Sequence, residues 1–125
     1  MTSGIRHVTV DCAHPYELAL FWARVLGSAV DEQDRPDDEV VLVPTGDIGM
    51  LFGRVPEGKT VKNRLHVDLQ PSDRTRDEEV ARLLDLGAVH VDDQRTPDGR
   101  GWVVLADPEG NEFCVERGES ERGLD

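Results

Sequence analysis

The chain has 125 residues and a mass of 13.9 kDa, enough for one ordinary domain or two very small units that share a core. Lys and Arg number 14 against 26 Asp and Glu, and the net charge of −12 argues against nucleic acid or an anionic membrane as a partner. Apolar residues occur in short blocks, none approaching the roughly 20 residues of a spanning helix, so a membrane protein is excluded.

The cysteines and the N-terminal residues both bear on the compartment. The start of the sequence lacks the apolar stretch of a secretory signal, and we therefore expect a cytoplasmic protein. Cys12 and Cys114 are the only cysteines, and neither lies in a metal-finger or Cys-x-x-Cys spacing. Free thiols in a reducing compartment are the simplest interpretation.

The first half of the chain predicts a strand, a helix and three short strands. Residues 6–11 alternate polar and apolar side chains, the pattern of a strand buried on one face. Apolar residues at three- and four-residue intervals from Leu18 to Leu26 predict an amphipathic helix that ends at Gly27. Short strands are then expected at residues 29–30, 40–43 and 50–52.

The second half repeats this order. Residues 65–69 alternate as the first strand does, and Thr75 with Glu78 forms the capping box of a second helix that ends at Gly87. Short strands are expected at residues 89–91, 102–105 and 113–115. The polar residues 118–125 are expected to be a loose tail.

The two halves align with each other as a tandem duplication. His66 follows His7 by 59 residues, and Cys114 follows Leu51 by 63. A slowly growing offset is what duplication with small loop insertions leaves behind. We therefore predict an α+β fold in which two tandem βαβββ modules form a curled mixed sheet around one concave cavity. The single domain would contain module one at about 5–54, a linker at 55–63 and module two at about 64–117.

Three segments carry a resemblance to a known family. They are residues 7–11, residues 62–69 and residues 104–115, the last containing an Asp-Pro-Glu-Gly-Asn turn before the final strand. The chain resembles the vicinal oxygen chelate superfamily, the group of glyoxalase I, extradiol dioxygenases and bleomycin-resistance proteins. The Lys-Asn-Arg-Leu-His sequence at 62–66 looks like the glyoxalase-like domain subgroup. The resemblance implies a homodimer that holds a small organic molecule.

The family's metal ligands map onto four positions here. Members with metal chemistry take two ligands from each module, from its first and fourth strands, usually two His and two Glu. Those positions fall on His7, His66, Leu51 and Cys114. Both carboxylates are therefore missing, and a thiolate in place of a carboxylate shifts a site toward softer ions.

Strand alternation predicts which side chains face the cavity. The expected ligand-binding residues are His7, Thr9, Leu51, His66, Asp68, Trp102 and Cys114. Glu112 and Glu116 should share the inward face with Cys114, and these three are the candidate catalytic residues. A basic cluster at Arg54, Lys59, Lys62 and Arg64 either neutralises nearby carboxylates or attracts an anion to the rim.

Two functions follow from these residues. The first is a small-molecule-binding protein akin to the bleomycin-resistance branch, without the usual metal site and without a cofactor. The alternative is a glyoxalase-type lyase or isomerase that holds a divalent metal (zinc, nickel or similar) on His7, His66 and Cys114, with Glu112 or Glu116 as base. Cys114 paired with a histidine as a nucleophile is a further hypothesis. The sequence leaves open whether the protein is an enzyme and what its ligand is.

Overall fold

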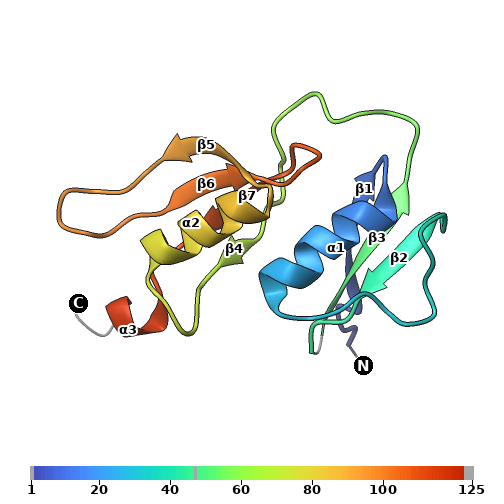
Figure 1. Cartoon of the computed structure of the whole chain (residues 1–125), viewed down its shortest axis with the longest axis horizontal. Helices are drawn as coiled ribbons and strands as arrows, with labels where there is room; N and C mark the ends of the chain where they lie inside the picture. Colours follow the sequence, from blue (N-terminus) through green and yellow to red (C-terminus); the bar gives the residue numbers. More distant parts are fainter. Residues whose placement is uncertain (1, 47, 123–125) are drawn as a thin grey trace. The chain divides into compact units, whose positions relative to one another are not determined.

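The structure, a computed structural model, describes residues 2–46 and 48–122. The chain forms two compact units that divide between Lys59 and Thr60 (Figure 1). Both contain one mixed sheet and a helix of about three turns, which confirms the α+β class. None of the helices within these ranges is long and apolar enough to cross a membrane.

The first unit is a three-stranded sheet packed against one helix. Its elements are β1 (His7–Cys12), α1 (Pro15–Leu26), β2 (Val40–Val43) and β3 (Gly49–Arg54). The strand order is β1-β3-β2, with β3 parallel to β1 and antiparallel to β2. The buried face of α1 carries Leu18, Phe21 and Trp22 at the predicted spacing, and Gly27 ends the helix in the left-handed conformation.

The strand predicted at residues 29–30 does not form. The acidic loop that follows occupies the free edge of β2 instead. The Asp31 N–H donates to the Leu42 carbonyl, and the Leu42 N–H donates to Asp34 Oδ2. These two bonds satisfy backbone groups of β2 that a fourth strand would otherwise pair with. Ala29 and Val30 therefore do not form a strand, despite their local preference for one.

The second unit has the full predicted order of one strand, one helix and three strands. Its elements are β4 (Asp68–Leu69), α2 (Arg76–Leu86), β5 (Val89–Asp93), β6 (Val103–Ala106), β7 (Glu112–Val115) and the short α3 (Glu119–Arg122). The sheet order is β4-β7-β6-β5, and only β4 and β7 are parallel. The capping box of Thr75 and Glu78 is confirmed, and β4 is shorter than predicted.

The strand registers bear out the duplication. Thr9 of β1 lies opposite Leu51 of β3, and Asp68 of β4 lies opposite Cys114 of β7. The offsets found in the sequence relate the two pairs, since 9 + 59 gives 68 and 51 + 63 gives 114. The first and last strands of each repeat therefore pair in the same register.

The two faces of the second sheet differ as strand alternation requires. Leu105, Phe113 and Val115 are fully buried on the face toward α2, whose Leu83 is also fully buried. The opposite face presents Cys114 and the residues that alternate with this apolar set. It is the face that carries the candidate site.

A side-chain cap holds the turn between β6 and β7. Asp107 is 1% exposed, and its Oδ1 accepts hydrogen bonds from the backbone N–H groups of Glu109 and Asn111. The amide of Asn111 donates to both carboxylate oxygens. The Asp-Pro-Glu-Gly-Asn sequence thus fixes the hairpin that brings β6 and β7 together.

The segment expected to be a loose tail is partly helical where the structure describes it. Residues 119–122 form α3, and Glu121 Oε1 accepts hydrogen bonds from the N–H groups of Gly118 and Arg76. These bonds connect the end of the chain to the start of α2. Residues 123–125 lie outside the described residues.

Replacing Asp107 with Ala should lower the free energy of unfolding by about 2–3 kcal/mol, because buried N–H groups lose their acceptor. Asp107→Asn keeps an oxygen at the same place and should lose less than half of that amount. Urea denaturation of both variants checks this. Equal losses of unfolding free energy in the two variants would show that an acceptor oxygen at the Oδ1 position does not preserve the turn.

Candidate functional site

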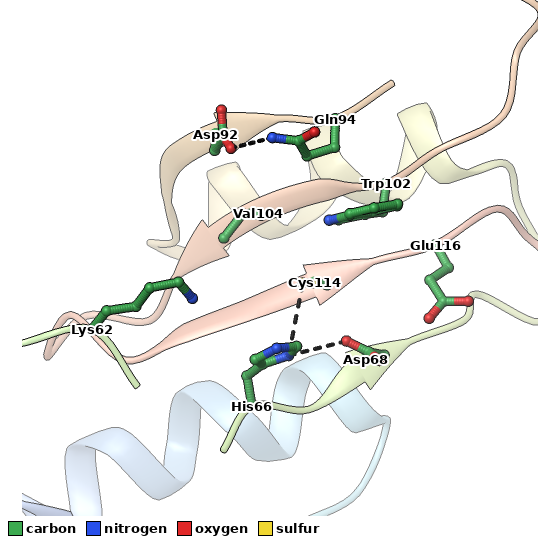
Figure 2. A pocket seen from close by; sticks show the side chains of 9 residues that line it. All are labelled: Lys62, His66, Asp68, Asp92, Gln94, Trp102, Val104, Cys114 and Glu116. Atoms are coloured by element: carbon green, nitrogen blue, oxygen red, sulfur yellow. Dashed lines mark hydrogen bonds and ion pairs between the residues drawn. The ribbon is translucent and has the colours of Figure 1, made fainter. Parts of the chain in front are cut away.

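A cavity of about 450 Å³ lies on the face of the second sheet that α2 leaves open. Figure 2 shows its walls, which come from the connector before β4 and from all four strands or their ends. The lining residues are Lys62, His66, Asp68, Asp92, Gln94, Trp102, Val104, Cys114 and Glu116. A volume of this size suits a small organic ligand.

The floor of the pocket is a row of paired residues across the sheet. Asp92 of β5 lies opposite Val104 of β6, Val104 opposite Cys114 of β7, and Cys114 opposite Asp68 of β4. Val103 pairs with Val115, so the residues one step outward, Trp102 and Glu116, are neighbours across the same two chain segments. Strand pairing alone therefore gathers these side chains.

His66, Asp68 and Cys114 form a tight group within the pocket. His66 Nδ1 lies 3.2 Å from Asp68 Oδ1 and 3.9 Å from Cys114 Sγ (Figure 2). Both contacts use the same ring nitrogen. A thiol–imidazole–carboxylate relay needs both nitrogens, one toward the nucleophile and one toward the carboxylate. The arrangement therefore lacks the geometry of a nucleophilic triad.

The surroundings of Cys114 keep its thiol protonated at neutral pH. Burial is the largest cause, and the negative charge of Asp68 adds to it, so the pKa of Cys114 rises to about 11. Lys62 opposes the shift. A thiol with a raised pKa is a poor nucleophile, because only the thiolate attacks.

Alkylation of Cys114 by iodoacetamide should be slow at neutral pH and should still accelerate as the pH approaches 11, where the thiolate forms. The measurement uses a Cys12→Ala background so that one thiol remains. Asp68→Asn removes a negative charge beside the thiol, so the midpoint should move to lower pH. A midpoint near the ordinary thiol pKa in the parent protein would contradict this account.

Glu112 ties the connector before β4 to β7. Its Oε2 accepts a hydrogen bond from the Asn63 backbone N–H at 3.1 Å, and its carbonyl oxygen accepts one from the Asn63 amide at 3.2 Å. The adjacent residue, Lys62, thereby reaches the end of the pocket. The Glu112 carboxylate faces Asn63 and does not line the cavity.

A buried arginine behind the pocket holds the loop that carries Trp102. Arg76 is 5% exposed, and its Nη1 donates to the carbonyl oxygens of Gly99, Arg100 and Gly101 at 3.1–3.2 Å. Its Nε lies 3.0 Å from Asp77 Oδ1. Both ends of the loop line the pocket, where the Gln94 N–H donates to the Trp102 carbonyl at 2.9 Å.

Within this loop, Gly101 cannot take a side chain. Its φ is 89°, and an added Cβ would overlap the Gln94 carbonyl oxygen. The close backbone approach at Gly101 and the Arg76 bonds together set the position of Trp102.

Arg76→Met should cost about 3 kcal/mol of stability, because three carbonyls lose their donor. It should also shift the indole N–H resonance of Trp102 in the ¹H–¹⁵N NMR spectrum. Arg100→Met removes the same charge from an exposed side chain of that loop and should change neither. An unmoved indole resonance in Arg76→Met would show that the clamp does not position Trp102.

The structure brings five of the predicted site residues together: His66, Asp68, Trp102, Cys114 and Glu116 all line the pocket. The other predicted wall residues, His7, Thr9 and Leu51, lie on β1 and β3 of the first unit. Their participation in the same site, including the metal set of His7, His66 and Cys114, stays a prediction.

Sequence reasoning missed Asp92 and Gln94 as pocket residues. Strand alternation along β5 could have indicated Asp92, which pairs with Val104. Gln94 follows the end of this strand, and its backbone N–H donates to the Trp102 carbonyl. Lys62 belongs to the basic cluster, and the sequence pattern gives no sign that it lines the pocket. Within that cluster, Arg54 pairs with Glu39 at 3.8 Å in the first unit.

The family comparison covers nearly the whole chain. The family model described as glyoxalase-like domain matches residues 7–116. No curated protein matches the sequence significantly.

Solved structures share the fold at low sequence identity. A glyoxalase/bleomycin resistance protein/dioxygenase family enzyme from Burkholderia phytofirmans PsJN is 20% identical, with a TM-score of 0.69 over 90% of this chain and 97% of the other. The fosfomycin resistance protein FosX from Mesorhizobium loti is 16% identical, with a TM-score of 0.69 over all of both chains. A FosX variant from Listeria monocytogenes, complexed with Mn(II) and 1S,2S-dihydroxypropylphosphonic acid, is 16% identical, with a TM-score of 0.72 over 99% and 98%.

Proposed function

The chain belongs to the glyoxalase-like domain family of the vicinal oxygen chelate superfamily, and from this premise we propose that it binds a small organic molecule in the pocket of its second unit. The observation that carries the proposal is the pocket itself. It combines an apolar wall, Trp102 and Val104, with polar groups at its ends. Apolar surface that binds the body of a ligand, with polar groups that fix its orientation, is typical of small-molecule sites.

We propose binding without a chemical step as the main activity. Cys114 is protonated at neutral pH. The same imidazole nitrogen, His66 Nδ1, contacts both Cys114 Sγ and Asp68 Oδ1. Glu116, the remaining candidate base in the pocket, pairs with Arg122 at 3.4 Å at the surface. This favours a binding or sequestering role akin to the bleomycin-resistance branch.

A metal-dependent lyase or isomerase is the second candidate, and one observation favours it. The ligand atoms of His66, Asp68 and Cys114 all lie within 4.8 Å of one another. Asp68 supplies a carboxylate, although not at the position where the family usually has one. Imidazole, thiol and carboxylate together fit zinc better than a hard ion such as Mn(II). These three residues would hold the ion, which would supply Lewis-acid chemistry to a bound oxygen atom.

A thermal-shift screen of small organic acids, amines and neutral ring compounds tests the main proposal. A ligand at 100 times its Kd should add about 2.7 kcal/mol to the free energy of unfolding. Trp102→Ala should abolish that shift, while Leu84→Ala, an exposed apolar residue of α2, should retain it. Shifts that survive Trp102→Ala would place the ligand elsewhere.

Elemental analysis separates the two candidates. Protein prepared without chelator or affinity tag should hold negligible zinc or nickel, and ligand shifts should persist in EDTA. Stoichiometric metal that disappears in His66→Ala and in Cys114→Ala would establish the alternative.

We also propose that both units form one domain, that the protein is a homodimer and that it is cytoplasmic. The match over residues 7–116 supports the single domain. The edge strand β5 supports the dimer, because Val89 and Val91 are 59% and 50% exposed there. Neither Cys12 nor Cys114 forms a disulfide, which fits a reducing compartment. Light scattering that gives the monomer mass would disprove the dimer.

A further inference from the structure

We infer that the pocket selects an organic cation, with the positive group bound between Trp102, Asp68 and Glu116. The inference rests on the proposed function and adds the chemical class of the ligand. It is based on the net negative charge of the pocket lining and on the exposed ring of Trp102.

The charges lining the pocket are unequal. Asp68, Asp92 and Glu116 carry three negative charges against the single ammonium of Lys62, so 1 − 3 gives −2 with His66 neutral. The whole chain has the same sign, at −12. A negative cleft on a negative protein raises the local concentration of cations and lowers that of anions.

The three carboxylates of the pocket differ in their hydrogen-bond and ion-pair partners. Asp92 accepts hydrogen bonds from the Gln94 amide and the Asp93 N–H, and it lies at the other end of the cross-strand row from Asp68. Asp68 lies beside the half-exposed imidazole of His66 and the thiol of Cys114, and Glu116 meets Arg122 at 3.4 Å with both side chains open to solvent. The side chains of Asp68 and Glu116 are 49% and 38% exposed, so a ligand can reach both carboxylates at the Trp102 end of the pocket.

The ring of Trp102 provides a second surface that can attract the same positive group. It is 44% exposed and lines the pocket, so a ligand can reach its ring. Figure 2 shows the ring on the same side of His66 as the carboxylates of Asp68 and Glu116, with Lys62 at the opposite end of the pocket. An aromatic face attracts cations, and nearby carboxylates reinforce that attraction.

Three other features fit a cation with an apolar body. Val104 and Cys114 line the floor between the two ends of the pocket and present uncharged surface. Lys62, at the far end, repels a positive group and so directs it toward Trp102. Lys62 has no ion-pair partner in the described part of the chain, and it can accept a polar or anionic tail of the same ligand.

The test measures binding of three matched probes by calorimetry: benzyltrimethylammonium, benzyl alcohol and phenylacetate. The cation should bind at least about tenfold more tightly than the other two, and added NaCl should weaken it. Trp102→Leu, which keeps apolar bulk but removes the aromatic face, should weaken the cation about tenfold. The double variant Asp68→Asn/Glu116→Gln should weaken it by about the same factor.

Asp85→Asn is the matched control, since it removes one carboxylate from α2 outside the pocket; its cation affinity should stay within about twofold of the parent. Tighter binding of phenylacetate, lost in Lys62→Met, would overturn the cation assignment while leaving the pocket as a small-molecule site. Cation binding unaffected by either pocket variant would overturn it as well. Binding of none of the three probes would also end it, and the ligand screen would then decide the proposed function separately.

Discussion

The parallel pairing of β4 with β7 is the contact on which the second unit's site depends. The ladder is short, but backbone bonds extend it, from Cys114 N–H to the Val67 carbonyl at 3.0 Å and from Glu116 N–H to the Leu69 carbonyl at 2.8 Å. This register sets the carboxylate of Asp68 beside the thiol. A slip of one residue would turn Cys114 toward α2 and leave the imidazole without its neighbours.

The same pairing sets the chemical character of the site. It places a carboxylate next to a buried thiol, and burial, followed by the negative charge of Asp68, raises the pKa of Cys114. The row thus presents a neutral sulfur and a charged oxygen side by side. Recognition by charge and shape suits such a surface better than attack by sulfur does.

Much of the fold followed from local pattern. The period-two alternation around Phe113 and Val115 predicted the buried face of β7, and the Thr75 capping box predicted the start of α2; both are confirmed. The expected strand at residues 29–30 failed because a tertiary partner, the edge of β2, was satisfied by loop groups. A sequence pattern indicates which conformation a segment prefers, but pairing with a neighbouring strand decides whether it forms a strand.

The site was less predictable for a geometric reason. Alternation placed His66, Asp68 and Cys114 on one face, yet it carried no information on which imidazole nitrogen each neighbour would meet. It also missed Gln94, because that residue joins the pocket through the loop that Arg76 holds from behind. Contacts set by buried side chains far along the chain leave no periodic trace in the sequence.

The repeated register has a consequence for how the two halves have diverged. The row that corresponds to Asp68 and Cys114 in the first unit is Thr9 and Leu51, which offer a hydroxyl and methyl groups. At these positions the second unit has ionisable side chains, and the first has one hydroxyl and one apolar side chain. The same strand register therefore carries different side-chain chemistry in the two units.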